Sequence, residues 1–342
     1  MSPLKIHIIY NFTDIPFGGA NQFLKALRDY FIKKDSYSNS IKEADVIILN
    51  SHLFGQGITL FKIISRYRKL LNEKTVLHRV DGPVSLYQKN NFFSVDKYIF
   101  KINRILADGT VFQSYWSQQE CKNIGMPSKP FELVTINAPD SSVFYPKYLP
   151  VPNRGKKIKL ISSSWSTNPN KGFDILEYLD SHLDFKKYEM TFIGRSPVSF
   201  RNIKLINSLP SFHLAEQLRN HHIFVSSSLR EACSNSLLEA MHCGCIPIAR
   251  NTSSNPEIIA NSGVLFEDQS DILNAIDRAV LNYDEFKEKN ILPSIQNIGE
   301  RYLKFCTKVH EGKNSKFKKI TFLNAISFKW SEIQFKIEQR IG

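Results

Sequence analysis

Residues 226–259, SSSLREACSNSLLEAMHCGCIPIARNTSSNPEII, join one apolar strand to a helix and a second strand. The apolar run Ile223–Val225 is the predicted strand before the helix, and the run Ile246–Ala249 is the predicted strand after it. Ser and Asn are preferred helix N-caps, so we expect the helix to begin at Ser234 or Asn235. Alternation of strand and helix favours an α/β fold.

Two glutamates flank the start of this predicted helix. Glu231 lies on the loop before it, and Glu239 lies eight positions later, within the helix. Uncapped amides at a helix start attract anions, and we expect those of Ser234, Asn235 and Ser236 to do so. Free amides beside two carboxylates suit a ligand with both phosphate and hydroxyl groups, such as a nucleotide sugar.

The composition limits the class of protein. With 342 residues, of which 42% are apolar and 23% charged, the chain is typical of a soluble globular protein with room for two domains. No window comes near the roughly eighteen uninterrupted apolar residues of a spanning helix, and the chain opens directly on a strand-like run. We therefore expect neither a membrane span nor a secretory signal.

The net charge of +13 indicates an anionic partner. Basic residues are spread along the chain, without the aromatic-interleaved basic motif of a nucleic-acid module. We therefore favour a phosphorylated ligand and an anionic membrane surface, and predict no nucleic-acid partner.

Five cysteines, an odd number, favour a reducing cytoplasm over a disulfide framework. Cys233, Cys243 and Cys245 lie close to His242, which raises the question of a zinc site. However, Cys243 and Cys245 end a predicted helix and enter a strand, where small buried residues are needed. We predict that this cluster packs in the core, and we predict no metal site.

From residue 4 onward, short apolar runs alternate with amphipathic segments, which predicts parallel sheets with crossover helices. The proline-rich stretch 144–155 interrupts this pattern, as an interdomain linker would. The predicted parts are a first domain over 1–150, a second over 151–285, a helix over 286–306 that could cross back to the first domain, and a basic tail over 307–342.

Two amphipathic helices are predicted between about 270 and 306, and a further one in the tail. The tail has eight Lys and Arg against three Glu. Its apolar residues recur at spacings of three and four, which makes one stripe on a helix. The stripe residues are Phe322, Ile326, Trp330, Ile333, Ile337 and Ile341. Such a helix can lie on an anionic bilayer; the alternative is that the stripe packs on the protein itself.

Ligands of open α/β sheets bind beyond the carboxyl ends of the strands. Gly18 and Gly19 follow the first strand, where paired glycines let a ligand approach the backbone; a tight turn is the alternative. Neither a third glycine of a dinucleotide fingerprint nor a Walker lysine follows. His78 and Asp81 stand at the end of strand 75–80 and are candidate ligand contacts; a turn with a satisfied strand-end histidine is the alternative.

Four motifs stand in an order typical of one family. They are Gly18-Gly19, Asn137-Ala138-Pro139-Asp140, Asn170-Lys171-Gly172-Phe173 and the pair Glu231 and Glu239 with seven residues between them. Over residues 4 to 306 the chain resembles the retaining glycosyltransferases of family 4, which are group 1 glycosyltransferases, with Ala138 where glycine is usual. The resemblance implies the GT-B fold, in which two Rossmann-like doubly wound domains face each other across a ligand-binding cleft.

The resemblance also implies roles for the candidate residues. Glu231 is expected to bind hydroxyls of the donor sugar, and Glu239 those of the ribose, because carboxylates accept several hydroxyl donors with charge-assisted strength. Lys171, the amide of Gly19 and the amides of 234–236 would surround the diphosphate. The donor would be a nucleotide diphosphate sugar, with no cofactor.

In this family the departing phosphate is thought to help deprotonate the acceptor, so we nominate no dedicated base. His78 and Asp81 are the candidates for contacts near the reacting carbons, with Asp81 nearer the acceptor. One departure is Ser166, which stands where many relatives place an arginine. Arg195, after a neighbouring strand, is the candidate substitute. The lack of an Asp-x-Asp motif agrees with metal-independent transfer.

The sequence thus predicts a cytoplasmic retaining hexosyltransferase, peripheral on the inner face of the membrane. It would move a sugar from a UDP- or GDP-sugar to a glycan or lipid-linked glycan, in cell-surface polysaccharide synthesis. A non-catalytic GT-B subunit that partners an active transferase and a GT-B glycoside phosphorylase are the alternatives.

Overall fold

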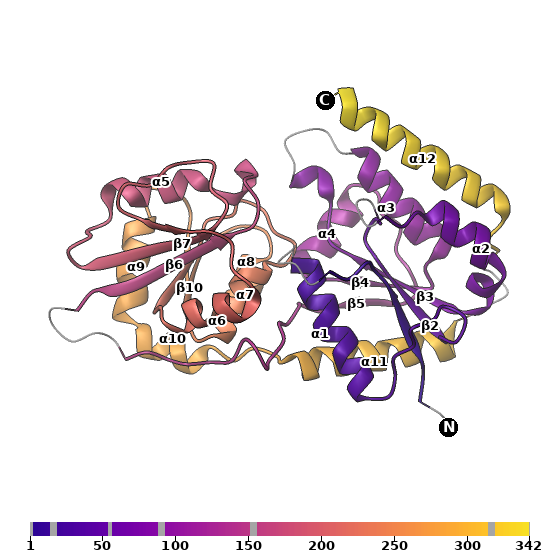
Figure 1. Ribbon diagram of the computed structural model, residues 1–342, viewed down its shortest axis with the longest axis horizontal. Helices are drawn as coiled ribbons and strands as arrows, with labels where there is room; N and C mark the ends of the chain where they lie inside the picture. The colour runs from indigo at the N-terminus through magenta and orange to yellow at the C-terminus, as the bar shows by residue number, and fades with distance from the viewer. Residues whose placement is uncertain are drawn as a thin grey trace. The chain divides into compact units, whose positions relative to one another are not determined.

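The computed structural model describes residues 3–13, 19–53, 57–87, 93–150, 156–313 and 319–341. The chain forms two compact units. Unit 1 comprises residues 1–12, 27–136 and 296–342, and unit 2 comprises residues 13–26 and 137–295. Each unit is a parallel sheet with helices, so the predicted α/β class is confirmed (Figure 1).

Unit 1 is built on a five-stranded parallel sheet in the order β1-β2-β3-β4-β5. Its strands are β1 (Ile6–Ile9), β2 (Val46–Asn50), β3 (Thr75–Val80), β4 (Gly109–Phe112) and β5 (Glu132–Val134). Every residue of β2, β3 and β4 is buried, as expected of parallel strands covered on both faces. The apolar runs in the sequence therefore located these strands.

Seven helices of the described chain contribute to unit 1. They are α1 (Gly19–Lys33), whose first half belongs to unit 2, η1 (Val84–Leu86), α2 (Leu60–Glu73), α3 (Phe93–Leu106), α4 (Tyr115–Asn123), α11 (Ile295–Gly312) and α12 (Phe322–Ile341). α11 and α12 bring the C-terminal part of the chain back to unit 1. The region predicted as two helices up to residue 306 instead contains three, because Asn282 and a stretch around residue 291 break the helical run.

The helix α12 lies along α2 and α3 (Figure 1). Ala325 and Phe328 are buried in the same apolar cluster as Leu60 and Ile63 of α2. The carboxylate of Glu332 accepts hydrogen bonds from the Leu60 amide at 3.0 Å and from the Tyr98 hydroxyl at 2.8 Å. The amide of Leu60 is one of the first of α2, which have no carbonyl partner within the helix. Glu332 therefore fixes both the position of α12 and the start of α2.

Unit 2 contains a six-stranded parallel sheet in the order β11-β10-β9-β6-β7-β8. Its strands are β6 (Ile158–Ser164), β7 (Tyr188–Gly194), β8 (Lys204–Ile206), β9 (Ile223–Ser226), β10 (Ile246–Arg250) and β11 (Val264–Phe266). Its helices, beside the start of α1, are η2 (Pro169–Lys171), α5 (Phe173–His182), α6 (Ser211–Arg219), α7 (Asn235–His242), α8 (Asn255–Ile259), α9 (Ile272–Leu281) and α10 (Tyr283–Lys289). The strand order reverses between β6 and β9, which is where ligands of doubly wound sheets bind.

The division between the units differs from the predicted boundary at residue 150, since residues 137–150 group with unit 2. Arg219 explains part of this grouping. Its guanidinium donates to the carbonyl of Val143 at 2.8 Å and lies 4.2 Å from the ring centroid of Tyr145. The amide of Lys147 donates to the carbonyl of Cys243 at 3.1 Å. The described part of the proline-rich stretch, residues 144–150, thus packs on unit 2.

In the part of the chain that the structure describes, no helix is both long enough and apolar enough to cross a membrane.

We predict that Glu332→Ala lowers the free energy of unfolding by about 2 kcal/mol, because a buried amide and a tyrosine hydroxyl lose their acceptor. Chemical denaturation measures this change. Lys336→Ala, an exposed position on the same helix, is the control and should change the free energy by no more than about 0.5 kcal/mol. Equal stabilities of the two variants would show that Glu332 does not anchor α12.

Candidate functional site

A cavity of about 220 Å³ opens in unit 2 beyond the carboxyl ends of β6 and β9, at the point where the strand order reverses. Its wall is formed by residues 163–166, at the end of β6 and just beyond it, by Lys171, and by residues between Glu231 and Glu239 after β9. The start of α1 and the side of α6 complete it through Gly19, Gln22, Ser211 and Leu214. The cavity therefore collects most of the residues singled out in the sequence.

The loops after β6 and β9 touch at Gly172. This residue has φ +69°, and a Cβ there would lie 2.0 Å from the carbonyl oxygen of Ser227. The hydroxyl of Ser227 donates to the carbonyl of Lys171 at 2.8 Å. The Leu229 amide donates to the Asn170 carbonyl, also at 2.8 Å. Glycine is needed at position 172 because the conformation and the lack of space both exclude a side chain.

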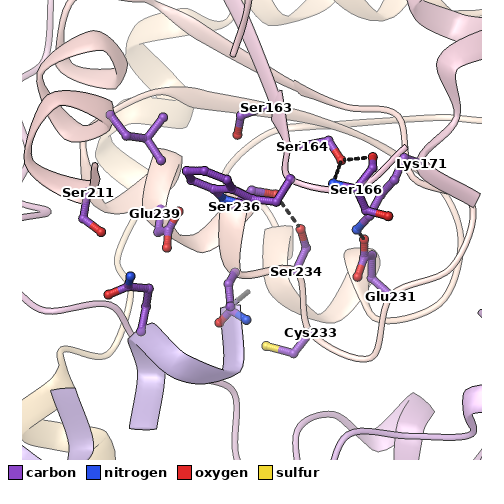
Figure 2. A pocket seen from close by; sticks show the side chains of 15 residues that line it. Ser163, Ser164, Ser166, Lys171, Ser211, Glu231, Cys233, Ser234, Ser236 and Glu239 are labelled. Carbon is purple, nitrogen blue, oxygen red and sulfur yellow. Dashed lines mark hydrogen bonds and ion pairs between the residues drawn. The ribbon is translucent and has the colours of Figure 1, made fainter. Parts of the chain in front are cut away.

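This contact brings the Lys171 ammonium to 2.5 Å from the Glu231 carboxylate. Both side chains are mostly buried, and they point toward each other at one end of the cavity (Figure 2). The backbone of Glu231 is fixed as well, since its amide donates to the Ser253 hydroxyl at 3.0 Å. A cation and an anion are thus held side by side on rigid loops, facing the cavity.

The helix α7 begins at the middle of the cavity wall. Ser234 is its N-cap, as predicted, and its hydroxyl accepts a hydrogen bond from the Leu237 amide. The amides of Asn235 and Ser236 precede any available helical carbonyl, so they can serve an anion in the cavity. A Cβ at Gly19 would lie 2.0 Å from the side chain of Asn235. Gly19 is therefore needed for close contact with α7, while Gly18 lies outside the described residues.

Glu239 lies at the other end of the cavity, near Ser211 (Figure 2). It is 7% exposed. Burial raises the pKa of its carboxyl to about 8. At neutral pH the side chain is therefore largely protonated, and it can donate one hydrogen bond as well as accept others. This differs from the ionised carboxylate that the sequence predicts at this position.

The charge missing at Ser166 is not replaced within the cavity of the described structure. Ser166 lines the cavity, and its carbonyl accepts a hydrogen bond from the Ser164 hydroxyl at 2.9 Å. Arg195 follows β7, and its amide donates to the Ser164 carbonyl. Its side chain is exposed and does not line the cavity. Arg195 is adjacent to the site through its backbone only.

Residues that were not among the sequence-based candidates also line the cavity or contact its wall. Trp165 and Ser211 line it, and Asn137 donates from its side-chain amide to Asn235 at 2.9 Å. Asn137 was noted only as part of a family motif. The sequence did contain a signal for Trp165, because it is an aromatic residue directly after the strand that precedes the Lys-Gly motif.

Unit 1 has a separate polar cluster at the carboxyl ends of β2, β3 and β4. Its centre is Asp81, whose carboxylate accepts hydrogen bonds of 2.6 Å from both Arg79 and Gln113. Arg79 also donates to the side chain of Asn50 at 2.5 Å. The Arg79 side chain is fully buried, whereas that of Asp81 is 35% exposed. The other oxygen of Asp81 accepts a long hydrogen bond of 3.5 Å from the Asn50 side chain, so its carboxylate is firmly held on a partly exposed side chain.

His78 has a different environment from Asp81. Its imidazole is fully buried, and its Nε2 atom donates to the carbonyl of Ser51 at 2.8 Å. Desolvation lowers its pKa to about 4. His78 is therefore a neutral histidine inside unit 1, and within that unit it has no exposed atom to offer a substrate.

All five cysteines are free and buried. Burial raises the pKa of the Cys243 thiol to about 12 and that of Cys245 well above its usual value. Among the described residues, no group of three or more His, Cys, Asp or Glu side chains is arranged to hold a metal ion. Cys243 and Cys245 are therefore part of the core of unit 2, whereas Cys233 lines the cavity.

Comparison with known proteins relates the part of the chain that contains Glu231, α7 and Glu239 to one family. Residues 200–291 match the model described as glycosyl transferases group 1. Over 95 residues the chain is 28% identical to a phosphatidylinositol N-acetylglucosaminyltransferase component from Arabidopsis thaliana. The match covers 27% of this chain and only 19% of that relative's length.

Solved structures resemble almost the whole chain. Sucrose-phosphate synthase from Thermosynechococcus elongatus superposes with a TM-score of 0.61 at 11% identity, covering 98% of this chain and 100% of that one. The lipopolysaccharide outer core galactosyltransferase WaaB gives 0.62 at 12% identity, covering 89% and 100%. HepE from Anabaena in complex with UDP-glucose gives 0.59 at 12% identity, covering 90% and 98%. These likenesses confirm the predicted GT-B fold.

The raised pKa of Glu239 predicts a pH dependence of stability. Because the folded state binds this proton more tightly than the unfolded state, the free energy of unfolding falls as pH rises from 4.5 to about 8. Glu239→Gln removes the titration. Its stability relative to the wild type should therefore increase by about 3 kcal/mol between about pH 5 and pH 8.

Denaturation curves across this pH range, without ligand, test the prediction. Glu177→Gln, at an exposed position on α5, is the matched control and should show the same pH dependence as the wild type. Parallel curves for Glu239→Gln and wild type would mean that Glu239 does not titrate in this range.

Proposed function

We propose, from its relation to the group 1 glycosyltransferases and its GT-B fold, that this protein transfers a sugar from a nucleotide diphosphate sugar to a glycan or lipid-linked glycan. The observation that supports this most directly is the cavity of unit 2, where Lys171, Glu231 and the start of α7 meet. One cation and free helix amides suit a diphosphate, while two glutamates suit sugar hydroxyls. The related HepE was solved with UDP and with UDP-glucose.

Donor binding would change the Lys171–Glu231 pair. The diphosphate competes for the Lys171 ammonium, and its other oxygens accept hydrogen bonds from the amides of Asn235 and Ser236. Glu231 then becomes available to accept hydrogen bonds from hydroxyls of the sugar. At the far end of the cavity, Glu239 binds the ribose hydroxyls, as donor or acceptor.

In the proposed reaction, the bond between the anomeric carbon and the diphosphate oxygen breaks, and negative charge develops on the leaving group. Lys171 and the α7 amides stabilise that charge, an effect typically worth about 3 kcal/mol per donor. The acceptor hydroxyl adds to the anomeric carbon on the same face, and its proton passes to the leaving phosphate. The sugar therefore keeps its anomeric configuration.

Unit 1 is proposed to supply the acceptor contact. Asp81 is the candidate, because Arg79 and Gln113 hold one of its oxygens while its side chain remains 35% exposed. His78 is neutral and buried, so its proposed role is indirect: it holds the carbonyl of Ser51.

We further propose hexosyl transfer from UDP- or GDP-sugars in polysaccharide synthesis, at the cytoplasmic face of a membrane. The free, buried cysteines agree with a reducing compartment.

Lys171→Ala should reduce turnover of the donor by about a hundredfold or more, because the leaving diphosphate loses its cation. Lys187→Ala is the matched control, since Lys187 is an exposed unit 2 lysine paired with Asp277. Purified variants are incubated with UDP- and GDP-sugars, and nucleotide release and binding are measured. Full turnover by Lys171→Ala would contradict the phosphate assignment. Sugar release that needs inorganic phosphate but no nucleotide would identify a phosphorylase instead.

Transfer is proposed to require no divalent ion, since the Lys171 cation and the helix amides neutralise the leaving group. Turnover should therefore remain within about twofold of its initial rate after EDTA treatment, a free-energy change of less than about 0.5 kcal/mol. The assay is repeated with added Mg²⁺ or Mn²⁺. Activity that EDTA abolishes and a divalent ion restores would contradict metal independence.

A further inference from the structure

The helix α12 has two distinct faces. Its inner face is fixed on unit 1 by buried Ala325 and Phe328 and by the hydrogen bonds of Glu332. Lys101 of α3 adds hydrogen bonds to the Ser327 carbonyl at 2.8 Å and to the Ser331 hydroxyl at 3.0 Å. Because the inner face is already used, the orientation of α12 on the unit is set.

The outer face of α12 bears a stripe of large apolar side chains that the described part of the protein leaves exposed. Each of these side chains is between 37% and 74% exposed. At about 100° per residue they fall within an arc of about 100°. The outer stripe comprises Phe322, Leu323, Ile326, Trp330, Ile333 and Ile337. It contains all the residues of the apolar stripe predicted from sequence except Ile341, whose side chain is not described.

Positive charge borders the outer stripe. Lys329 and Lys336 are exposed and lie seven residues apart, both along the same edge of the outer stripe. Together α2, α3 and α12 contain ten Lys and Arg against four Asp and Glu. Two of these acids are already engaged within the unit, since Asp96 accepts from the amides of Val84 and Ser85, and Glu332 caps α2.

We propose that the outer stripe of α12 docks the protein on an anionic lipid bilayer. Its apolar side chains would enter the boundary between headgroups and acyl chains, with Trp330 at that level. The lysines at its edge would extend toward the anionic headgroups while their methylene chains stay on the apolar side. This surface lies outside the donor cavity and does not depend on the proposed reaction.

The test is flotation of the full-length protein with vesicles of phosphatidylcholine alone and with vesicles that also contain phosphatidylglycerol. We expect binding to the anionic vesicles that weakens as salt is added. Trp330→Glu and Ile337→Glu should each weaken binding by about tenfold or more. Ile291→Glu is the matched control, because Ile291 is an isoleucine of unit 2 that is more exposed than Ile337, at 85% against 52%. It should bind vesicles as the wild type does.

Thermal unfolding and nucleotide binding are measured on the same variants to separate docking from folding and from the donor site. Both should remain at wild-type values in Trp330→Glu. Vesicle binding by Trp330→Glu and Ile337→Glu that equals the wild type would overturn the proposal. So would a wild-type protein that does not bind anionic vesicles but self-associates through Trp330, since the occupant of the stripe would then be a second copy.

Discussion

The close contact of the loops after β6 and β9 is the constraint on which the candidate site depends. Gly172 allows it, because a Cβ at this position would overlap the carbonyl of Ser227. The contact exists only because the strand order reverses here, which makes β6 and β9 neighbours although β7, β8 and α6 lie between them in the chain. Lys171 and Glu231, sixty residues apart, meet as a result. Local sequence and sheet topology thus jointly create one ion pair.

The Lys171–Glu231 pair stabilises both of the charges that it holds in the cavity wall. A lone buried lysine or glutamate would lose hydration without compensation, whereas the pair compensates both. Glu239 avoids the loss of hydration of a buried charge by remaining protonated. In the proposed reaction, the diphosphate would take the place of Glu231 as the partner of Lys171 and would leave the Glu231 carboxylate free. Binding of the diphosphate to Lys171 would thus also make Glu231 available to the sugar hydroxyls.

Most of the fold could be predicted because its signals are local. Buried runs such as Thr75–Val80 gave strands to within a residue or two, and Ser234 marked the start of α7. The domain boundary and the environment of His78 could not be predicted in this way. Arg219 fastens residues 143–145 from far along the chain, and the burial of His78 depends on Ser51 and Asn103. Such contacts follow from tertiary structure and leave no periodic signal.

The tail shows why one hydrophobic pattern can leave two interpretations open. A stripe at spacings of three and four predicts an amphipathic helix but not which side of that helix meets the protein. In α12 the side that packs is the less apolar one, with Ala325, Phe328 and the polar Glu332. Glu332 has a specific task there, since it caps α2, and a hydrogen bond of this kind fixes orientation more strictly than apolar burial does. The described part of unit 1 leaves the richer apolar side exposed, at a place where the neighbouring helices supply excess positive charge.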